Sequence, residues 1–178
     1  MALSPNIILI GCMGSGKSAV ATELSKISDF KKIDTDNVIE TKTNTKISEI
    51  FKTKGEDYFR SLETQICNQL PKLKNKVIAT GGGIVLSQEN RHLLKSSGLV
   101  VYLKASIPVL VKRVSNSTHR PLLQNNDTKT VLTNLLKKRD PLYEETAHHI
   151  LETDIFSVQD IANKILALYN HEINWQEV

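Results

Sequence analysis

The sequence GCMGSGKS at residues 11–18 decides the fold, because it joins an apolar run at 6–10 to an amphipathic helix pattern. The pattern G-x-x-x-x-G-K-[ST] between a strand and a helix is typical of a phosphate-binding loop. Its glycines let backbone N–H groups surround phosphate oxygens, and the helix N-terminus adds partial positive charge. We therefore predict a nucleotide site made by Gly14, Ser15, Gly16, Lys17, Ser18 and Ala19.

The rest of the chain alternates short apolar runs with helical patterns. After the first strand, further strands are expected near 32–34, 77–80, 98–103 and 150–151. Helices are expected directly after the loop and over 47–53, 56–70, 106–114, 128–139 and 157–169. This alternation predicts an α/β fold with a doubly wound, five-stranded parallel sheet flanked by helices. We expect a single domain over 1–178, with the polar, aperiodic segment 115–127 as a surface loop.

Composition excludes several classes of protein. The net charge is +4 over 178 residues, but basic and acidic residues are spread evenly, so no basic patch indicates nucleic acid. The longest uncharged run, 1–16, is too short and too interrupted to span a membrane, and it has no basic region typical of a secretory signal. Cys12 and Cys67 form no zinc or disulfide pattern. We expect a cytoplasmic protein with neither a nucleic-acid nor a membrane partner.

Two motifs of other phosphate-loop proteins are missing. The guanine-reading pattern N-K-x-D has one candidate, at 75–78, which lacks the aspartate, and no run of four apolar residues ends in an acid. Asp34 can replace that acid, since a carboxylate at the end of the second strand faces the phosphate loop. In an extended segment Asp34 and Asp36 would project from one side. The alternative interpretation is a turn or helix cap before Val38.

Three further elements carry groups suited to binding an anion. Arg60 lies three residues before Glu63, a spacing at which the two can pair on a helix. Gly81-Gly82-Gly83 follows a buried strand, so bare backbone can approach a ligand there. Arg139 is expected at the end of a helix. Arg91 belongs to no motif and is assigned to a solvated face.

Taken together, these elements resemble the shikimate kinase family, within the nucleoside-monophosphate-kinase-like group. The matching segments occur in family order along nearly the whole chain: GCMGSGKS at 11–18, DTD at 34–36, FRSLE at 59–63, ATGGGIV at 79–85, RPLL at 120–123 and RDPLYEE at 139–145. One departure is His148, which follows Ala147 where the family usually has aspartate, close to the last predicted strand.

The resemblance implies a kinase that transfers the γ-phosphoryl group of ATP to the 3-hydroxyl of shikimate, giving shikimate 3-phosphate and ADP in aromatic amino acid biosynthesis. Lys17, Asp36 and Arg120 are the catalytic candidates. Mg²⁺ would be held by Ser18, with Asp34 acting through water. Arg120, which would also contact the nucleotide, lies in the 115–127 loop, which we interpret as a lid that excludes water on closure.

The implied shikimate site occupies the region 34–63 and the turn at Gly82. Arginine suits a carboxylate because its planar fork offers paired donors, so Arg60 and Arg139 would clamp that group. Asp36 would accept from the hydroxyls, and the Gly82 N–H would complete the pocket, with phenylalanines at 51 and 59 as walls. A monomer is expected. The alternatives are another small-molecule kinase, such as a gluconate or nucleoside-monophosphate kinase, and a non-catalytic nucleotide-dependent regulator or chaperone.

Overall fold

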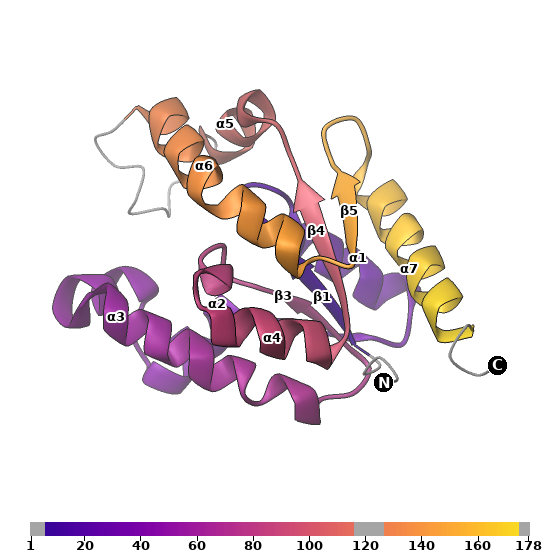
Figure 1. The fold of residues 1–178 in the computed structure, drawn as a ribbon, viewed down its shortest axis with the longest axis horizontal. Coiled ribbons are helices and arrows are strands. Elements are labelled where there is room, and N and C mark those ends of the chain that lie inside the picture. The colour runs from indigo at the N-terminus through magenta and orange to yellow at the C-terminus, as the bar shows by residue number, and fades with distance from the viewer. Residues whose placement is uncertain (1–5, 116–126, 175–178) are drawn as a thin grey trace.

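The computed structural model describes residues 6–115 and 127–174. The strands in this part of the chain are β1 (Ile7–Ile10), β2 (Lys31–Asp34), β3 (Lys76–Ala79), β4 (Leu99–Lys104) and β5 (His149–Glu152). The α-helices are α1 (Lys17–Ile27), α2 (Thr35–Thr43), α3 (Ile47–Cys67), α4 (Gln88–Ser97), α5 (Ile107–Ser115), α6 (Thr128–Thr146) and α7 (Val158–Asn174). Two short 3-10 helices are η1 (Leu70–Lys72) and η2 (Ile84–Leu86). Figure 1 shows their arrangement.

All five strands pair in parallel, in the order β2-β3-β1-β4-β5. The predicted five-stranded parallel α/β fold is therefore confirmed. The strand β3 enters between β1 and β2, with Leu9 opposite Ala79 and Asp34 also opposite Ala79. Because parallel strands end at one edge, the segments that follow β1, β2 and β3 meet there.

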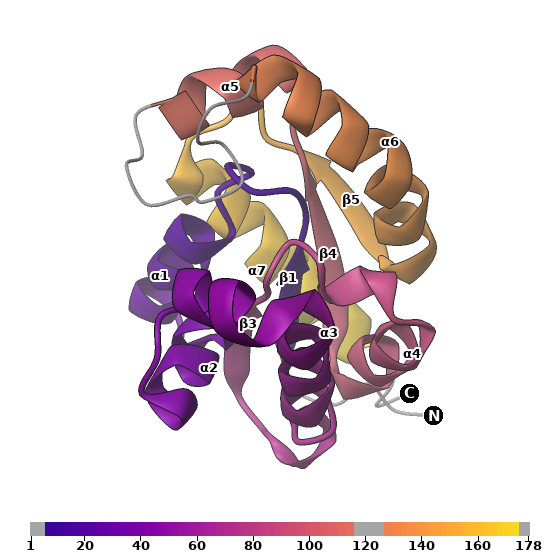
Figure 2. The same ribbon diagram turned by 90° about the vertical axis from the view of Figure 1, so that its left-hand side faces the viewer.

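Helices cover both faces of the sheet, as Figure 2 shows from the side. The helices α1 and α7 pack on one face, where Leu24 and Ile165 are fully buried with alternate residues of the strands. The helices α2 to α6 cover the other face, around Ile78 and Tyr102. Strands buried on both sides explain the continuous apolar runs in the sequence.

Several elements differ from the sequence-based expectation. The helices α2 and α4 were not expected; Ser87 is the N-cap of α4, and its side chain accepts the N–H of Asn90. The two helices expected at 47–53 and 56–70 are the two parts of α3, which bends at Gly55 (φ 81°). The second part ends at Cys67, before η1.

The helix expected over 128–139 does not end at Arg139 as predicted, because α6 continues through Pro141 to Thr146. A proline inside a helix removes one hydrogen bond and costs about 3 kcal/mol. Beyond the proline, Tyr143 and Thr146 are fully buried, so tertiary packing offsets this cost.

His148 directly precedes β5. Its Nδ1 accepts the backbone N–H of Val100 over 2.9 Å, and its own backbone N–H donates to the Val100 carbonyl. The ring therefore supplies an acceptor at the β4–β5 junction, and β5 forms as expected. Among the described residues, no helix is long and apolar enough to cross a lipid bilayer.

Candidate active site

The phosphate loop connects β1 to α1 in the setting that its sequence predicts. Gly11, Gly14 and Gly16 all have positive φ, at 144°, 82° and 99°. Gly16 is left-handed and directly precedes α1, so a residue with a Cβ would be strained there. The loop thus brings backbone N–H groups to the N-terminus of α1, which favours an anion.

Lys17 folds back over this loop. Its Nζ donates to the carbonyls of Gly11 over 2.7 Å and Cys12 over 2.9 Å, and the residue is 9% exposed. The ammonium group therefore lies inside the curve of the loop, where a nucleotide phosphate would compete with these carbonyls for it.

Ser18 and Asp34, the two predicted metal ligands, are brought together. The Ser18 hydroxyl donates to Asp34 Oδ2 over 2.7 Å, while Oδ1 of the same carboxylate accepts the backbone N–H groups of Asp36 and Asn37. Asp34 is thus also the N-cap of α2. The helix-cap interpretation of this residue is confirmed, and its other oxygen contacts the phosphate loop through Ser18.

A hydroxyl and a carboxylate form an oxygen donor set that suits Mg²⁺. In the described residues, no cluster of three or more His, Cys, Asp and Glu side chains can hold a metal ion. Mg²⁺ commonly takes one or two protein ligands and completes its shell with phosphates and water. The pair therefore fits Mg²⁺ bound together with a nucleotide.

Asp36 is in the first turn of α2, so the expectation of an extended Asp34–Asp36 segment was wrong. The Asp34 cap turns the chain directly into a helix. The Asp36 side chain nevertheless lines the same cavity as the phosphate loop. Burial and the nearby Asp34 carboxylate raise the pKa of Asp36, although Lys17 and Arg60 act in the opposite direction. Its Oδ1 is buried without a hydrogen-bond partner in the described part of the chain.

Arg60 is held by two glutamates of its own helix, α3. Its Nη1 donates to Glu63 Oε2 over 2.6 Å, and Nε and Nη2 both donate to Glu56 Oε1. The Glu63 side chain is only 1% exposed, so this is not the exposed helix pair that usually contributes little. Burial raises the pKa of Glu63, and the charges of Arg60 and Arg139 partly oppose that rise.

The triple glycine makes room for these side chains. A Cβ on Gly81 would lie 2.6 Å from Asp36 Oδ1 and 2.9 Å from Glu63 Oε1. A Cβ on Gly83 would lie 2.2 Å from Arg60 Nη1. Neither glycine has positive φ, so the requirement for glycine here comes from space rather than from backbone conformation.

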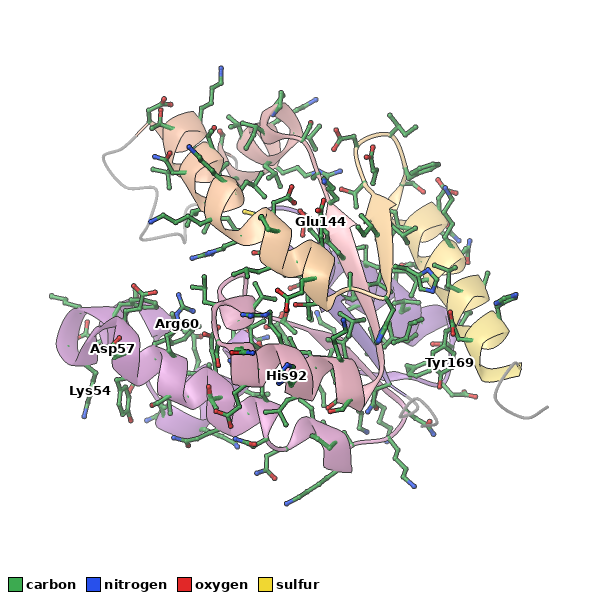
Figure 3. The ribbon with its side chains drawn as sticks, viewed as in Figure 1. Lys54, Asp57, Arg60, His92, Glu144 and Tyr169 are labelled. Carbon is green, nitrogen blue, oxygen red and sulfur yellow. The ribbon has the colours of Figure 1, made fainter. Side chains whose placement is uncertain are left out.

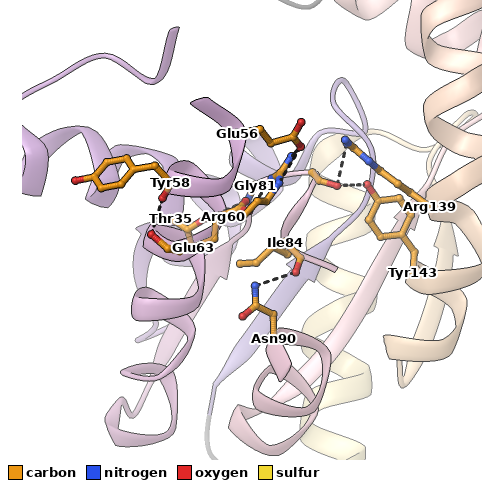
Figure 4. Close-up of polar contacts among 12 residues, drawn as sticks. Thr35, Glu56, Tyr58, Arg60, Glu63, Gly81, Ile84, Asn90, Arg139 and Tyr143 are labelled. Atoms are coloured by element: carbon orange, nitrogen blue, oxygen red, sulfur yellow. Dashed lines mark hydrogen bonds and ion pairs between the residues drawn. The ribbon is translucent and has the colours of Figure 1, made fainter. Parts of the chain in front are cut away.

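Arg139 approaches the turn from α6, opposite α3. It is 8% exposed, and its Nη1 donates to the Gly82 carbonyl over 3.3 Å. Tyr143, one helical turn later, donates its hydroxyl to the same carbonyl over 2.5 Å. Figure 4 shows Arg60 with Glu63 and Arg139 with Tyr143 around the turn. The sequence assigned the Gly82 N–H to this site, whereas the protein contacts at Gly82 are made through its carbonyl.

One cavity of about 1110 Å³ joins all of these groups. It runs from the phosphate loop past Asp36 to Arg60 and Arg139. Phe51 and Phe59, whose ring centroids are 4.8 Å apart, form the expected apolar wall. In Figure 3, Arg60 lies on the side of α3 nearest α6, while Lys54 and Asp57 lie toward its outer end. The cavity therefore offers one anion-binding subsite beside the phosphate loop and another between Arg60 and Arg139.

The sequence also assigned positions to Arg120 and Arg91, and the structure describes only Arg91. Arg120 and nearly all of the predicted lid, 116–126, lie outside the described residues. Arg91 was wrongly assigned to solvent: its side chain is 13% exposed and Nη1 donates to the Val85 carbonyl, with Glu145 3.4 Å from Nε. The unexpected helix α4 carries Arg91 toward α6, which the sequence did not predict.

Three contributors to the site were missed. Glu56 pairs with Arg60, and its position four residues earlier on one helix could have indicated this. Thr35 accepts the Gly81 N–H through Oγ1 over 2.9 Å. Tyr143 bonds Gly82 from a segment that the sequence placed outside a helix. No local sequence pattern predicts the Thr35 and Tyr143 contacts, because their partners are 46 and 61 residues away in the sequence.

Comparisons with known proteins indicate one family. A family model described as shikimate kinase matches residues 13–170. The shikimate kinase of Acinetobacter baumannii (strain AYE) is 43% identical over 164 residues, covering 92% of this chain and 91% of its own. That of Marinomonas sp. (strain MWYL1) is 44% identical over 168 residues, covering 93% and 92%. A solved structure of an Acinetobacter baumannii shikimate kinase in complex with shikimate has a TM-score of 0.89 and 42% identity, covering 94% of each chain.

Proposed function

The chain belongs to the shikimate kinase family, and from this premise we propose how its own residues phosphorylate shikimate. The reaction transfers the γ-phosphoryl group of ATP to the 3-hydroxyl of shikimate and releases ADP. The oxygen of that hydroxyl forms a bond to the γ-phosphorus while the bond to the bridging oxygen of ADP breaks. The hydroxyl proton passes to Asp36.

The nucleotide lies on the phosphate loop, Gly14 to Ala19. Lys17 leaves the loop carbonyls and bonds the β- and γ-phosphates, since a phosphate carries more negative charge than a carbonyl oxygen. Ser18 holds Mg²⁺ directly and Asp34 holds it through water. When bound, Mg²⁺ neutralises charge on the phosphates. Arg120 contributes a further cation to the phosphates when the proposed lid, 115–127, closes.

Shikimate lies between α3 and α6. The proposed binding region 34–63 forms one wall of its site, and α6 forms the opposite wall. Its carboxylate pairs with the guanidinium groups of Arg60, which is half-buried, and Arg139, which is 8% exposed. Its hydroxyls bond to Asp36 and the Gly82 N–H. Glu63 and Glu56 fix Arg60, so the fork is oriented before the substrate arrives.

The observation that carries this proposal is the position of Asp36. Its buried carboxylate lies in the same cavity as both the phosphate loop and the two arginines, so one substrate can reach the arginines and the γ-phosphate together. The test is ADP release from Mg-ATP with shikimate, gluconate or a nucleoside monophosphate offered separately. We expect release with shikimate alone. Turnover with gluconate or the monophosphate alone would overturn the assignment.

Three further properties belong to this proposal. The chain acts as one kinase domain over 1–178. It acts in the cytoplasm, which is supported by a sequence whose two cysteines, Cys12 and Cys67, match no disulfide pattern. It acts as a monomer on small molecules. The large apolar side chains that are exposed in the described residues are scattered over several elements rather than forming one broad patch.

A further inference from the structure

The turn Gly81-Gly82-Gly83 has no conformational preference of its own. Three consecutive glycines have more backbone freedom than any other tripeptide, and none of the three has the positive φ that would identify a glycine-specific turn. The conformation that presents this turn to the cavity must therefore be selected by contacts from outside it.

Two buried hydroxyl groups make those contacts from opposite sides. Thr35 Oγ1 accepts the Gly81 N–H over 2.9 Å, and the Tyr143 hydroxyl donates to the Gly82 carbonyl over 2.5 Å. Both residues are fully buried, at 0% exposure. They hold the Thr80–Gly81 and Gly82–Gly83 peptide groups, and the Ile84 N–H holds the peptide group between these two by donating to the Gly81 carbonyl over 3.3 Å. In the part of the chain described, the N–H groups of Gly82 and Gly83 have no protein acceptor, and both residues line the cavity.

The Tyr143 hydroxyl also allows Arg139 to leave the Gly82 carbonyl. Both side chains donate to the Gly82 carbonyl, but the arginine contact is the longer one, at 3.3 Å. When Arg139 turns to a substrate carboxylate, Tyr143 keeps the carbonyl bonded. The arginine can then bind its ligand without leaving an unpaired carbonyl or releasing the turn.

Thr35 has an equivalent place on the other side. It is the first residue of α2 and lies between Asp34 and Asp36. Its bond to Gly81 therefore fixes the glycine turn relative to both carboxylates.

We propose that Thr35 and Tyr143 are positioning residues that hold the glycine turn ready for shikimate, with the N–H groups of Gly82 and Gly83 directed at the substrate. This inference rests on the function proposed above. A turn that is already ordered binds more tightly, because its conformational entropy is not lost on binding. Loss of either hydroxyl should therefore weaken shikimate binding and leave the nucleotide site unchanged.

The test compares Thr35→Val and Tyr143→Phe, each close in shape to the original residue, by steady-state kinetics with both substrates varied. We expect KM for shikimate to rise about ten-fold or more in each variant, with KM for ATP within about two-fold of the original. Thr35→Ser restores a hydroxyl and should recover most of the loss. Thr43→Val, on the same helix, and Tyr169→Phe, on α7, are matched controls with unchanged kinetics, since neither hydroxyl contacts the turn.

A second measurement is the rise in melting temperature that each ligand produces. In the two variants shikimate should raise it less than in the original protein, while an ATP analogue should raise it equally. An unchanged KM for shikimate in both variants, or equal losses for both substrates, would overturn the inference. A protein that fails to phosphorylate shikimate before any substitution would instead overturn the proposed function, so the two failures are distinguishable.

Discussion

Ser18 donates its hydroxyl to Asp34 Oδ2 over 2.7 Å, although 16 residues of sequence separate the two. Ser18 lies in the first turn of α1 and Asp34 ends β2, so the contact joins the nucleotide loop to the end of the second strand. The second oxygen of Asp34 caps α2, which carries Asp36. This one carboxylate therefore links the proposed metal site to the proposed base.

Asp34→Asn should weaken the response to Mg²⁺ while the fold is retained. Asparagine caps helices nearly as well as aspartate, but it removes the negative charge opposite the metal. We expect the Mg²⁺ concentration for half-maximal activity to rise about 10–100-fold at fixed ATP. The measurement is a Mg²⁺ titration of ADP release, with Ser18→Thr as the control that keeps a hydroxyl. An unshifted titration curve would remove Asp34 from the metal site.

Arg139→Lys should reduce shikimate affinity and leave ATP binding nearly intact. Lysine keeps the charge but loses the paired donors of the guanidinium, which are worth about 1.5–3 kcal/mol, or about 10–100-fold. KM for each substrate measures this. Arg91→Lys, outside the cavity on α4, is the matched control. Equal weakening of both substrates would place Arg139 outside the shikimate subsite.

Lys17→Ala should abolish most of the turnover. The variant removes the cation that lies inside the curve of the loop, and loss of such electrostatic stabilisation typically lowers kcat by about a hundred-fold or more. Lys26→Ala, on the exposed face of the same helix, should leave kcat unchanged. Near-normal turnover in Lys17→Ala would mean that this loop is not the catalytic one.

Asp36 should set the acidic limb of the pH profile. It acts as a base only when ionised, and burial raises its pKa above the ordinary value of 3.8. The value of kcat/KM for shikimate, which reports groups of the free enzyme, should therefore fall on acidification at a higher pH than an ordinary aspartate would give. If kcat/KM remained flat down to pH 4, Asp36 would not be the base.

Asp36→Asn should stabilise the ligand-free protein at neutral pH even though it removes activity. Because the folded-state pKa is raised, the stability associated with protonated Asp36 is complete below about pH 3.8 and is lost as the pH rises through the folded-state pKa. At pH 7 the variant avoids this loss, and its melting temperature should be higher by about 2–4 °C for each 1 kcal/mol relieved.

The difference in melting temperature should shrink as the pH falls toward that of ordinary aspartate titration. Asp57→Asn, an exposed position on α3, is the control and should melt like the original protein at every pH. A lower melting temperature for Asp36→Asn at pH 7 would contradict the prediction.

Local patterns predicted much of this protein. Three apolar runs and two shorter strand candidates indicated five parallel strands, and GCMGSGKS indicated the phosphate loop, because these signals depend on neighbouring residues. The same locality explains the failures. The helix was expected to end at Arg139, but α6 continues through Pro141 because residues beyond it are buried against distant parts of the chain. Arg91 had no motif, and its side chain is shielded from solvent by contacts with Val85 and Glu145 that only the fold brings together.

The sequence by itself determined which chemical groups are present and which local segments carry them: a phosphate loop, Asp34 and Asp36, and arginines suited to anions. Only the tertiary structure decided how they meet. The insertion of β3 between β1 and β2 brings the glycine turn beside both carboxylates, and α6 brings Arg139 and Tyr143 to it from the other side. The physical reason is the distance along the sequence over which each interaction acts. Backbone propensity acts over a few residues, whereas strand order and buried hydroxyl contacts depend on residues 46 or 61 positions apart.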